Sequence, residues 1–117
     1  MPHVLLIEDD PALRLAFRDF LIRSGFEVTA VAADETVRDV DIVVCDYRLP
    51  GGKRGTELVQ SVRGRAARPI PAIVVTGDSG QQAASDAAAL GNARLLLKPV
   101  RMDVLVAEIR SLLNAER

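Results

Sequence analysis

The chain reads Asp41-Ile-Val-Val-Cys-Asp-Tyr-Arg-Leu-Pro-Gly51 near its centre. The apolar residues that follow Asp41 are mostly β-branched, which is typical of a strand buried on both faces of a parallel sheet. Asp46 comes directly after this run, and a proline and a glycine then break the pattern. We therefore expect a central strand that presents the Asp46 carboxylate at the rim of a sheet.

Four similar apolar runs flank this one, and segments with helical periodicity separate them. The predicted strands cover residues 4–7, 27–31, 41–45, 72–76 and 94–97. Strands that alternate with amphipathic helices predict an α/β fold, in which a parallel sheet carries helices on both faces. The apolar residues that mark the four helices are Leu13, Phe17, Phe20 and Leu21; Leu58, Val59 and Val62; Ala83, Ala84, Ala87, Ala88 and Leu90; and Val104, Leu105, Ile109, Leu112 and Leu113.

The first helix has clear boundaries, and one connection in the chain is short. Asp10 is placed to cap that helix, Pro11 suits its first turn, and Gly25 follows its end. Only residues 32–40 join the second and third strands, whereas a crossover with its helix usually takes at least about ten to twelve residues. We expect a short second helix there, of a single turn, or irregular backbone.

Length and composition limit the class of protein. The 117 residues are enough for one domain, which we expect to span 1–117. A net charge of -1 lacks the basic footprint of a nucleic-acid-binding domain, and the single cysteine, Cys45, excludes an intramolecular disulfide. The apolar runs are far shorter than the roughly 18 residues of a membrane span. We expect a soluble cytoplasmic domain.

Polar side chains follow the predicted strands at the edge where open parallel sheets bind ligands. Glu8 and Asp9 follow the first strand, Asp46 follows the third, Thr76 ends the fourth and Lys98 follows the fifth. Two carboxylates about 4 Å apart repel by roughly 1 kcal/mol in water and roughly 4 kcal/mol at an effective dielectric constant of 20. Three such groups favour a cation, and hard oxygen ligands in an incomplete cage suit Mg²⁺.

Each of these residues also has a structural interpretation. Any one acid alone is more simply a solvated surface group, Thr76 an ordinary strand-end threonine, and Lys98 a loop lysine. Together they fit phosphoryl chemistry, because an aspartate beside a metal can act as a nucleophile toward phosphorus. We interpret His3 and Cys45 as structural residues, since neither has a companion ligand.

The same residues resemble the receiver domain of two-component response regulators. The resemblance covers essentially the whole chain, and four segments carry it in order: Val4-Leu-Leu-Ile-Glu-Asp-Asp10, Asp41-Ile-Val-Val-Cys-Asp-Tyr-Arg-Leu-Pro-Gly51, Ile73-Val-Val-Thr-Gly77 and Leu96-Leu-Lys-Pro99. The fold that it implies is flavodoxin-like (CheY-like), with a five-stranded parallel sheet of order 2-1-3-4-5. The implied function is to accept a phosphoryl group from a histidine kinase or a histidine phosphotransfer protein, with Mg²⁺ as cofactor.

The resemblance also implies a role for each residue of the rim. Glu8 and Asp9 are then the metal-binding acids, Asp46 is the phosphoacceptor and a metal ligand, and Thr76 is the switch hydroxyl. Lys98 contacts the phosphoryl group and precedes a cis peptide bond to Pro99. The loop after Asp46 and the leucine run before Lys98 are similar to receivers attached to hybrid sensor histidine kinases.

Two departures from the family pattern bear on function. Leu95 stands where many receivers have a Tyr or Phe that rotates inward, so we expect a weak response around Leu95 and Val104 and a monomer or weak dimer. Arg48 and Asp78 each lie two residues after a site residue, and in the family these positions flank the path of the hydrolytic water. Pairing between the two would hinder that water.

Two other functions stay open from the sequence. A phosphatase of the haloacid dehalogenase type also uses an aspartyl phosphate and Mg²⁺, but it needs a second acid two residues after the nucleophile, where this chain has Arg48. A receiver-like interaction domain that is never phosphorylated would not need the full set of acids, hydroxyl and amine. The leading interpretation is a signalling module that is not a dedicated enzyme and that has neither nucleic acid nor a membrane as a partner.

Overall fold

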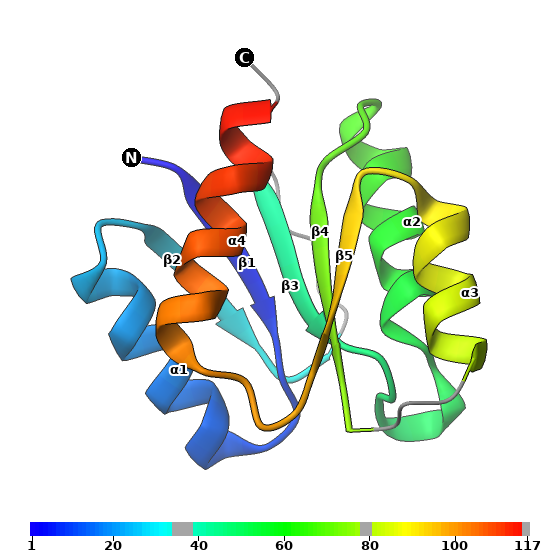
Figure 1. Ribbon diagram of the computed structural model, residues 1–117, viewed down its shortest axis with the longest axis horizontal. Helices are drawn as coiled ribbons and strands as arrows, with labels where there is room; N and C mark the ends of the chain where they lie inside the picture. Colours follow the sequence, from blue (N-terminus) through cyan, green and yellow to red (C-terminus); the bar gives the residue numbers. More distant parts are fainter. Residues whose placement is uncertain (34–38, 78–80, 116–117) are drawn as a thin grey trace.

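The chain folds into a parallel β-sheet between two layers of helices (Figure 1). A computed structural model describes residues 1–33, 39–77 and 81–115. In chain order its elements are β1 (His3–Ile7), α1 (Pro11–Arg23), β2 (Glu27–Val31), β3 (Ile42–Asp46), a 3₁₀ helix (Pro50–Gly52), α2 (Gly55–Ala66), β4 (Ala72–Thr76), α3 (Gln81–Leu90), β5 (Ala93–Leu97) and α4 (Met102–Ala115). The strand order is β2-β1-β3-β4-β5, which confirms the flavodoxin-like topology.

Two apolar cores hold the layers together, one on each face of the sheet. Helices α1 and α4 cover one face, where Leu21, Leu105 and Ile109 pack against β-strand residues. Helices α2 and α3 cover the other face with Leu58, Val59 and Ala83 (Figure 1). Alternate residues of β1 and β3 therefore enter opposite cores, as the side-chain alternation of a strand requires.

The central strands and the edge strands differ in burial. All residues of β3 and β4 are buried, as expected for strands covered on both faces. Because the runs at residues 27–31 and 94–97 are similarly apolar, we expected buried strands there as well, and this is wrong: β2 and β5 are largely half-exposed, and Leu97 is 54% exposed. The reason is that an edge strand has a neighbour on one side only.

The local signals around α1 act as predicted. The Asp10 carboxylate accepts hydrogen bonds from Ala12 N (2.9 Å) and Leu13 N (3.3 Å), and Pro11 opens the helix. Gly25, just beyond the helix, has φ +98°, a conformation that glycine adopts without strain. Asp10 is thus occupied as a helix cap.

Residues 34–38 belong to the short link in which we expected a one-turn second helix, and this expectation lies outside the described residues. Among the described residues, no helix has the length and apolar character needed to span a membrane.

Candidate functional site

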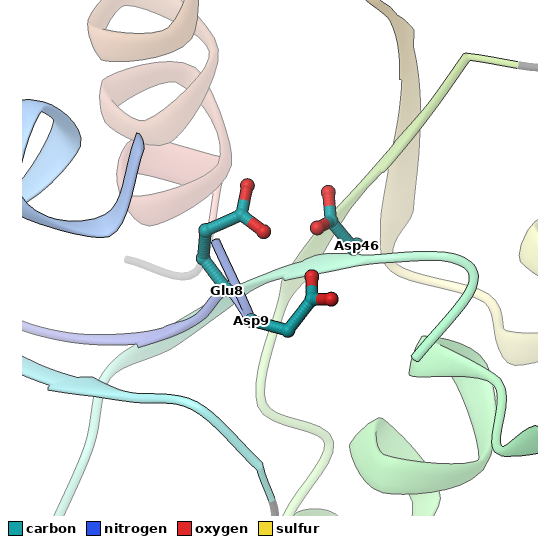
Figure 2. Close-up of side chains that lie close together, drawn as sticks. All are labelled: Glu8, Asp9 and Asp46. Atoms are coloured by element: carbon teal, nitrogen blue, oxygen red, sulfur yellow. The ribbon is translucent and has the colours of Figure 1, made fainter. Parts of the chain in front are cut away.

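Three carboxylates converge at the carboxyl ends of β1 and β3. Strand β3 pairs with β1 so that Cys45 lies opposite Ile7, which brings Asp46 beside Glu8 and Asp9. The side chains point toward one another (Figure 2), and one ligand oxygen from each lies within 4.8 Å of the others. Glu8 is 2% and Asp46 7% exposed, whereas Asp9 is exposed. The predicted acid cluster therefore exists as a partly buried group open on the Asp9 side.

The electrostatics of this cluster favour a bound cation. Burial, then the hydrogen bond and negative charge of Asp46, raise the pKa of Glu8 to about 8. A proton on Glu8 thus reduces the repulsion between the carboxylates, and a bound metal ion would reduce the same repulsion. Carboxylate oxygens in an open cluster of this size fit Mg²⁺, which retains several water ligands.

An amine lies on the opposite side of Asp46. Lys98 Nζ is 2.9 Å from Asp46 Oδ1, and the Lys98 backbone N–H donates to Thr76 O at 2.8 Å. Burial opposes the charge on the amine, but the hydrogen bond and charge of Asp46, together with the charges of Glu8 and Asp9, outweigh burial and raise the Lys98 pKa. The Lys98–Pro99 peptide bond is cis, as the resemblance implied. The amine is therefore held in its charged form beside Asp46.

A hollow opens over Asp46 between these groups. Its volume is about 260 Å³, and its lining residues are Asp46, Arg48, Val75, Thr76, Gly77 and Lys98. Thr76 is 3% exposed and ends β4 one position beyond Val75, which pairs with Asp46. The hollow thus presents a carboxylate, a hydroxyl and two cationic side chains to one small space.

The backbone after Asp46 is packed tightly against helix α2. Tyr47 N donates to Val75 O at 2.8 Å, and Gly55 N donates to Tyr47 O at 2.7 Å. A Cβ on Gly55 would collide with the Asp46 carbonyl oxygen and lie 2.8 Å from Cys45 Sγ. Gly55 is therefore required for this close approach. We did not single it out in the sequence, where it stands near two other glycines in an apparent loop.

Other side chains lie where they play structural parts. His3, at the opposite end of β1, has Nε2 2.6 Å from Thr29 Oγ1. Cys45 is buried in β3, and burial raises the pKa of its thiol to about 12, so it is packed and unreactive. Asp78, which we considered as a partner of Arg48, lies outside the described residues.

Comparisons with known proteins agree with this geometry. The family model of the response regulator receiver domain matches residues 4–110. The chain is 34% identical over 118 residues to the regulatory protein VirG of Agrobacterium tumefaciens (strain 15955), covering 94% of this chain and 43% of that protein. It is 32% identical over 115 residues to the transcriptional regulatory protein FixJ of Bradyrhizobium diazoefficiens, covering 93% and 55%. This chain thus spans about half the length of these curated relatives.

A solved structure shares the whole fold. The response regulator receiver protein from Sinorhizobium medicae WSM419 superposes with a TM-score of 0.87 at 26% sequence identity. The match covers 99% of this chain and 97% of that chain. The arrangement of strands and helices described above is therefore shared with a solved receiver protein.

Proposed function

The chain belongs to the response regulator receiver domain family, and on that premise we propose that Asp46 is its phosphoacceptor. Membership implies a histidine kinase or phosphotransfer protein as partner. The observation that supports Asp46 most directly is its position between two sets of groups. Glu8 and Asp9 lie on one side of its carboxylate, and Lys98 Nζ lies 2.9 Å from Oδ1 on the other.

The proposed reaction is a phosphoryl transfer from a phosphohistidine. A carboxylate oxygen of Asp46 attacks phosphorus, the P–N bond breaks, and its electron pair leaves with the donor imidazole, which is then protonated. Lys98 stabilises negative charge on the phosphoryl oxygens, and the Thr76 hydroxyl donates to one of them. Thr76 and Lys98 both line the hollow that would receive the group.

We propose Glu8, Asp9 and Asp46 as the residues that hold Mg²⁺. When bound, the ion supplies positive charge that neutralises the carboxylates and the transferring group. Glu8 is desolvated and must lose its proton to serve as a ligand, which is the reason that its raised pKa matters. Asp9 is exposed, so its side chain can follow the ion without disturbing the core.

The receiver is a signalling module, and we propose that its only catalysis is its own phosphorylation and dephosphorylation within one domain, residues 1–117, in the cytoplasm. A dedicated aspartyl-phosphate phosphatase would place a second acid two residues after Asp46. Arg48 occupies that position and lines the hollow over Asp46. A cation there binds a phosphoryl oxygen but cannot serve as the general acid and base that repeated turnover of substrate needs.

The test is phosphorylation by acetyl phosphate with Mg²⁺, followed by intact-mass spectrometry and peptide mapping. We expect one added phosphoryl group, located on Asp46, and none in an Asp46→Asn variant. Asp103→Asn, which removes an exposed acid that is not part of the Glu8–Asp9–Asp46 cluster, serves as the matched control and should retain wild-type labelling. Labelling of Asp46→Asn at wild-type yield would contradict the proposal, and so would a wild-type protein that is never labelled.

A further inference from the structure

The side chain of Tyr47 joins the candidate acceptor residue to helix α3. Tyr47 follows Asp46 directly, and its side chain is 3% exposed in the core that α2 and α3 cover. Its hydroxyl donates a 2.6 Å hydrogen bond to Asp86 Oδ2, in the middle of α3. A residue next to the candidate phosphorylation site is thus bonded to a helix 39 positions away in the sequence.

Two further side chains hold the Asp86 carboxylate in position for this bond. Arg54 Nη1 lies 3.2 Å from the same oxygen, and Gln82 Nε2 donates to Oδ1 at 2.8 Å. The hydrogen bond from Tyr47, followed by those from Gln82 and Arg54 and the charge of Arg54, lowers the pKa of Asp86 although partial burial opposes the shift. The bond therefore runs from a neutral hydroxyl to an ionised carboxylate, the stronger class of hydrogen bond.

The backbone of Tyr47 cannot move independently of the site. Its N–H is bonded to Val75 O on β4, and its carbonyl oxygen accepts from Gly55 N at the start of α2. Both neighbouring elements also border Asp46, since Val75 pairs with Asp46 and Gly55 packs on its carbonyl. Asp46 and Tyr47 therefore share the same two neighbouring elements, β4 and α2.

Arg48 contacts both the Tyr47 ring and the hollow in which a phosphoryl group would lie. Its guanidinium carbon lies 5.9 Å from the centroid of the Tyr47 ring, and its side chain lines the hollow over Asp46. A phosphoryl group carries about -1.5 to -2 charges near neutral pH, which exceeds the single charge of the carboxylate it would modify. Added negative charge in the hollow attracts Arg48 and so alters the cationic contact on the Tyr47 ring.

We propose that the Tyr47–Asp86 hydrogen bond carries the phosphorylation state of Asp46 to helix α3. This inference rests on the proposed function of Asp46 and adds a route that starts at the residue next to it. Leu95, on β5, packs against the same core but has no polar atom with which to bond α3. Coupling between two sites is reciprocal, so Asp86 also acts as a positioning residue for the loop that follows Asp46.

The experiment compares backbone NMR spectra with and without beryllofluoride and Mg²⁺ in the whole chain. We expect the wild type to show shifts at Asp9, Asp46 and Lys98 and also along α3, at Ala83 and Ala87. Tyr47→Phe removes the hydroxyl and keeps the ring in the core. It should keep the shifts at Asp9 and Lys98 and lose more than half of the shift at Ala83 and Ala87.

Asp86→Ala breaks the same bond from a partly exposed position and should give the same loss, and the double variant should lose no more than either single variant. Gln82→Ala is the matched control, because it removes a contact to Asp86 but leaves the Tyr47 bond. The inference would be overturned if Tyr47→Phe showed the same shifts at Ala83 and Ala87 as the wild type. It would also be overturned if the wild type with beryllofluoride and Mg²⁺ showed shifts at Asp9, Asp46 and Lys98 but none along α3. Absence of shifts at Asp9, Asp46 and Lys98 in the wild type would instead overturn the proposed function, and this inference with it.

Discussion

The two sides of Asp46 are built in opposite ways. On the β1 side, Glu8 is 2% exposed at the end of an inner strand. On the β5 side, the Lys98 side chain is 37% exposed and follows the edge strand of the sheet. The first side is a partly buried cluster of three acids, and the second is an open ion pair.

This difference separates two tasks that phosphoryl transfer imposes on one site. Desolvated acids with a fixed geometry suit a metal ion, because the protein meets the cost of their repulsion when it folds. An exposed amine beside an open hollow suits a donor protein that must bring its phosphoryl group from outside. The inner strand and the edge strand provide these two environments from the same sheet.

Addition of Mg²⁺ has the largest expected effect, on the acid side. The ion relieves repulsion that exists only in the folded state, so it should stabilise the protein by roughly 2.7 kcal/mol at 100 times its Kd. Thermal unfolding at constant ionic strength measures this as a rise in Tm. Asp9→Asn should abolish most of the rise, whereas Asp103→Asn should leave it unchanged. A wild-type Tm that millimolar Mg²⁺ does not change would contradict the proposal that Glu8, Asp9 and Asp46 hold the ion.

The second effect is a pH dependence that belongs to Glu8. Its pKa is raised from 4.5 to about 8 in the metal-free fold, so the folded state keeps a proton that the unfolded state has lost. The contribution of Glu8 to stability is therefore complete below about pH 4.5 and falls as pH rises toward 8. The slope from this one group is at most about 1.4 kcal/mol per pH unit. Urea unfolding in EDTA between pH 6 and 8 measures it.

Two variants isolate the contribution of Glu8 to this slope. Glu8→Gln should flatten it, because the amide does not titrate, while Glu108→Gln, at a partly exposed position of α4 that contacts Arg94, should not change it. Saturating Mg²⁺ should also flatten the slope in the wild type, since the ion replaces the proton. If the metal-free protein became more stable from pH 6 to 8, and Glu8→Gln showed the same slope, the raised pKa of Glu8 would be contradicted.

The rim was predictable from the sequence because it depends on periodicity alone. Each apolar run marks a strand, the carboxyl ends of parallel strands meet at one edge, and the residue after the first, third and fifth runs is polar. The placement of Glu8 and Asp46 follows from that rule without any knowledge of side-chain direction. The exposure of Asp9 and the burial of Glu8 do not follow from it, because they depend on how the chain passes from β1 into α1.

The connection to α3 was not predictable. Tyr47 and Asp86 are 39 residues apart, and helical periodicity in an alanine-rich segment does not indicate which residue of α3 turns toward the loop after β3. Gly55 was missed for a related reason. Its importance comes from a contact with the Asp46 carbonyl, which only the packing of α2 against β3 creates.

A smaller effect is expected on the open side, at Arg48. Its side chain lines the hollow over Asp46, so it restricts the approach of water to a phosphoryl group there. We expect Arg48→Ala to shorten the lifetime of the phosphorylated form by about three- to tenfold, which corresponds to roughly 0.7–1.4 kcal/mol in the barrier to hydrolysis. The rate of phosphorylation by acetyl phosphate should change less. Lys53→Ala, an exposed change on the same loop, is the control, and an unchanged lifetime in Arg48→Ala would refute the expectation.

The smallest effect of phosphorylation is expected at Leu95, in the middle of the edge strand β5. This leucine is half-buried against the core shared with α2 and α3, and a change in its rotamer exposes little area and moves no polar group. A modification shifts a two-state equilibrium only by its differential interaction with the two states, so the edge strand and α4 have little to transmit. In NMR spectra with beryllofluoride and Mg²⁺ we expect shifts at Leu95 and Val104 well below those at Ala83 and Ala87, and sedimentation should show no change in oligomeric state. A dimer that forms on phosphorylation and that Leu95→Ala abolishes would show that the edge strand, and not α3 alone, reports the state of Asp46.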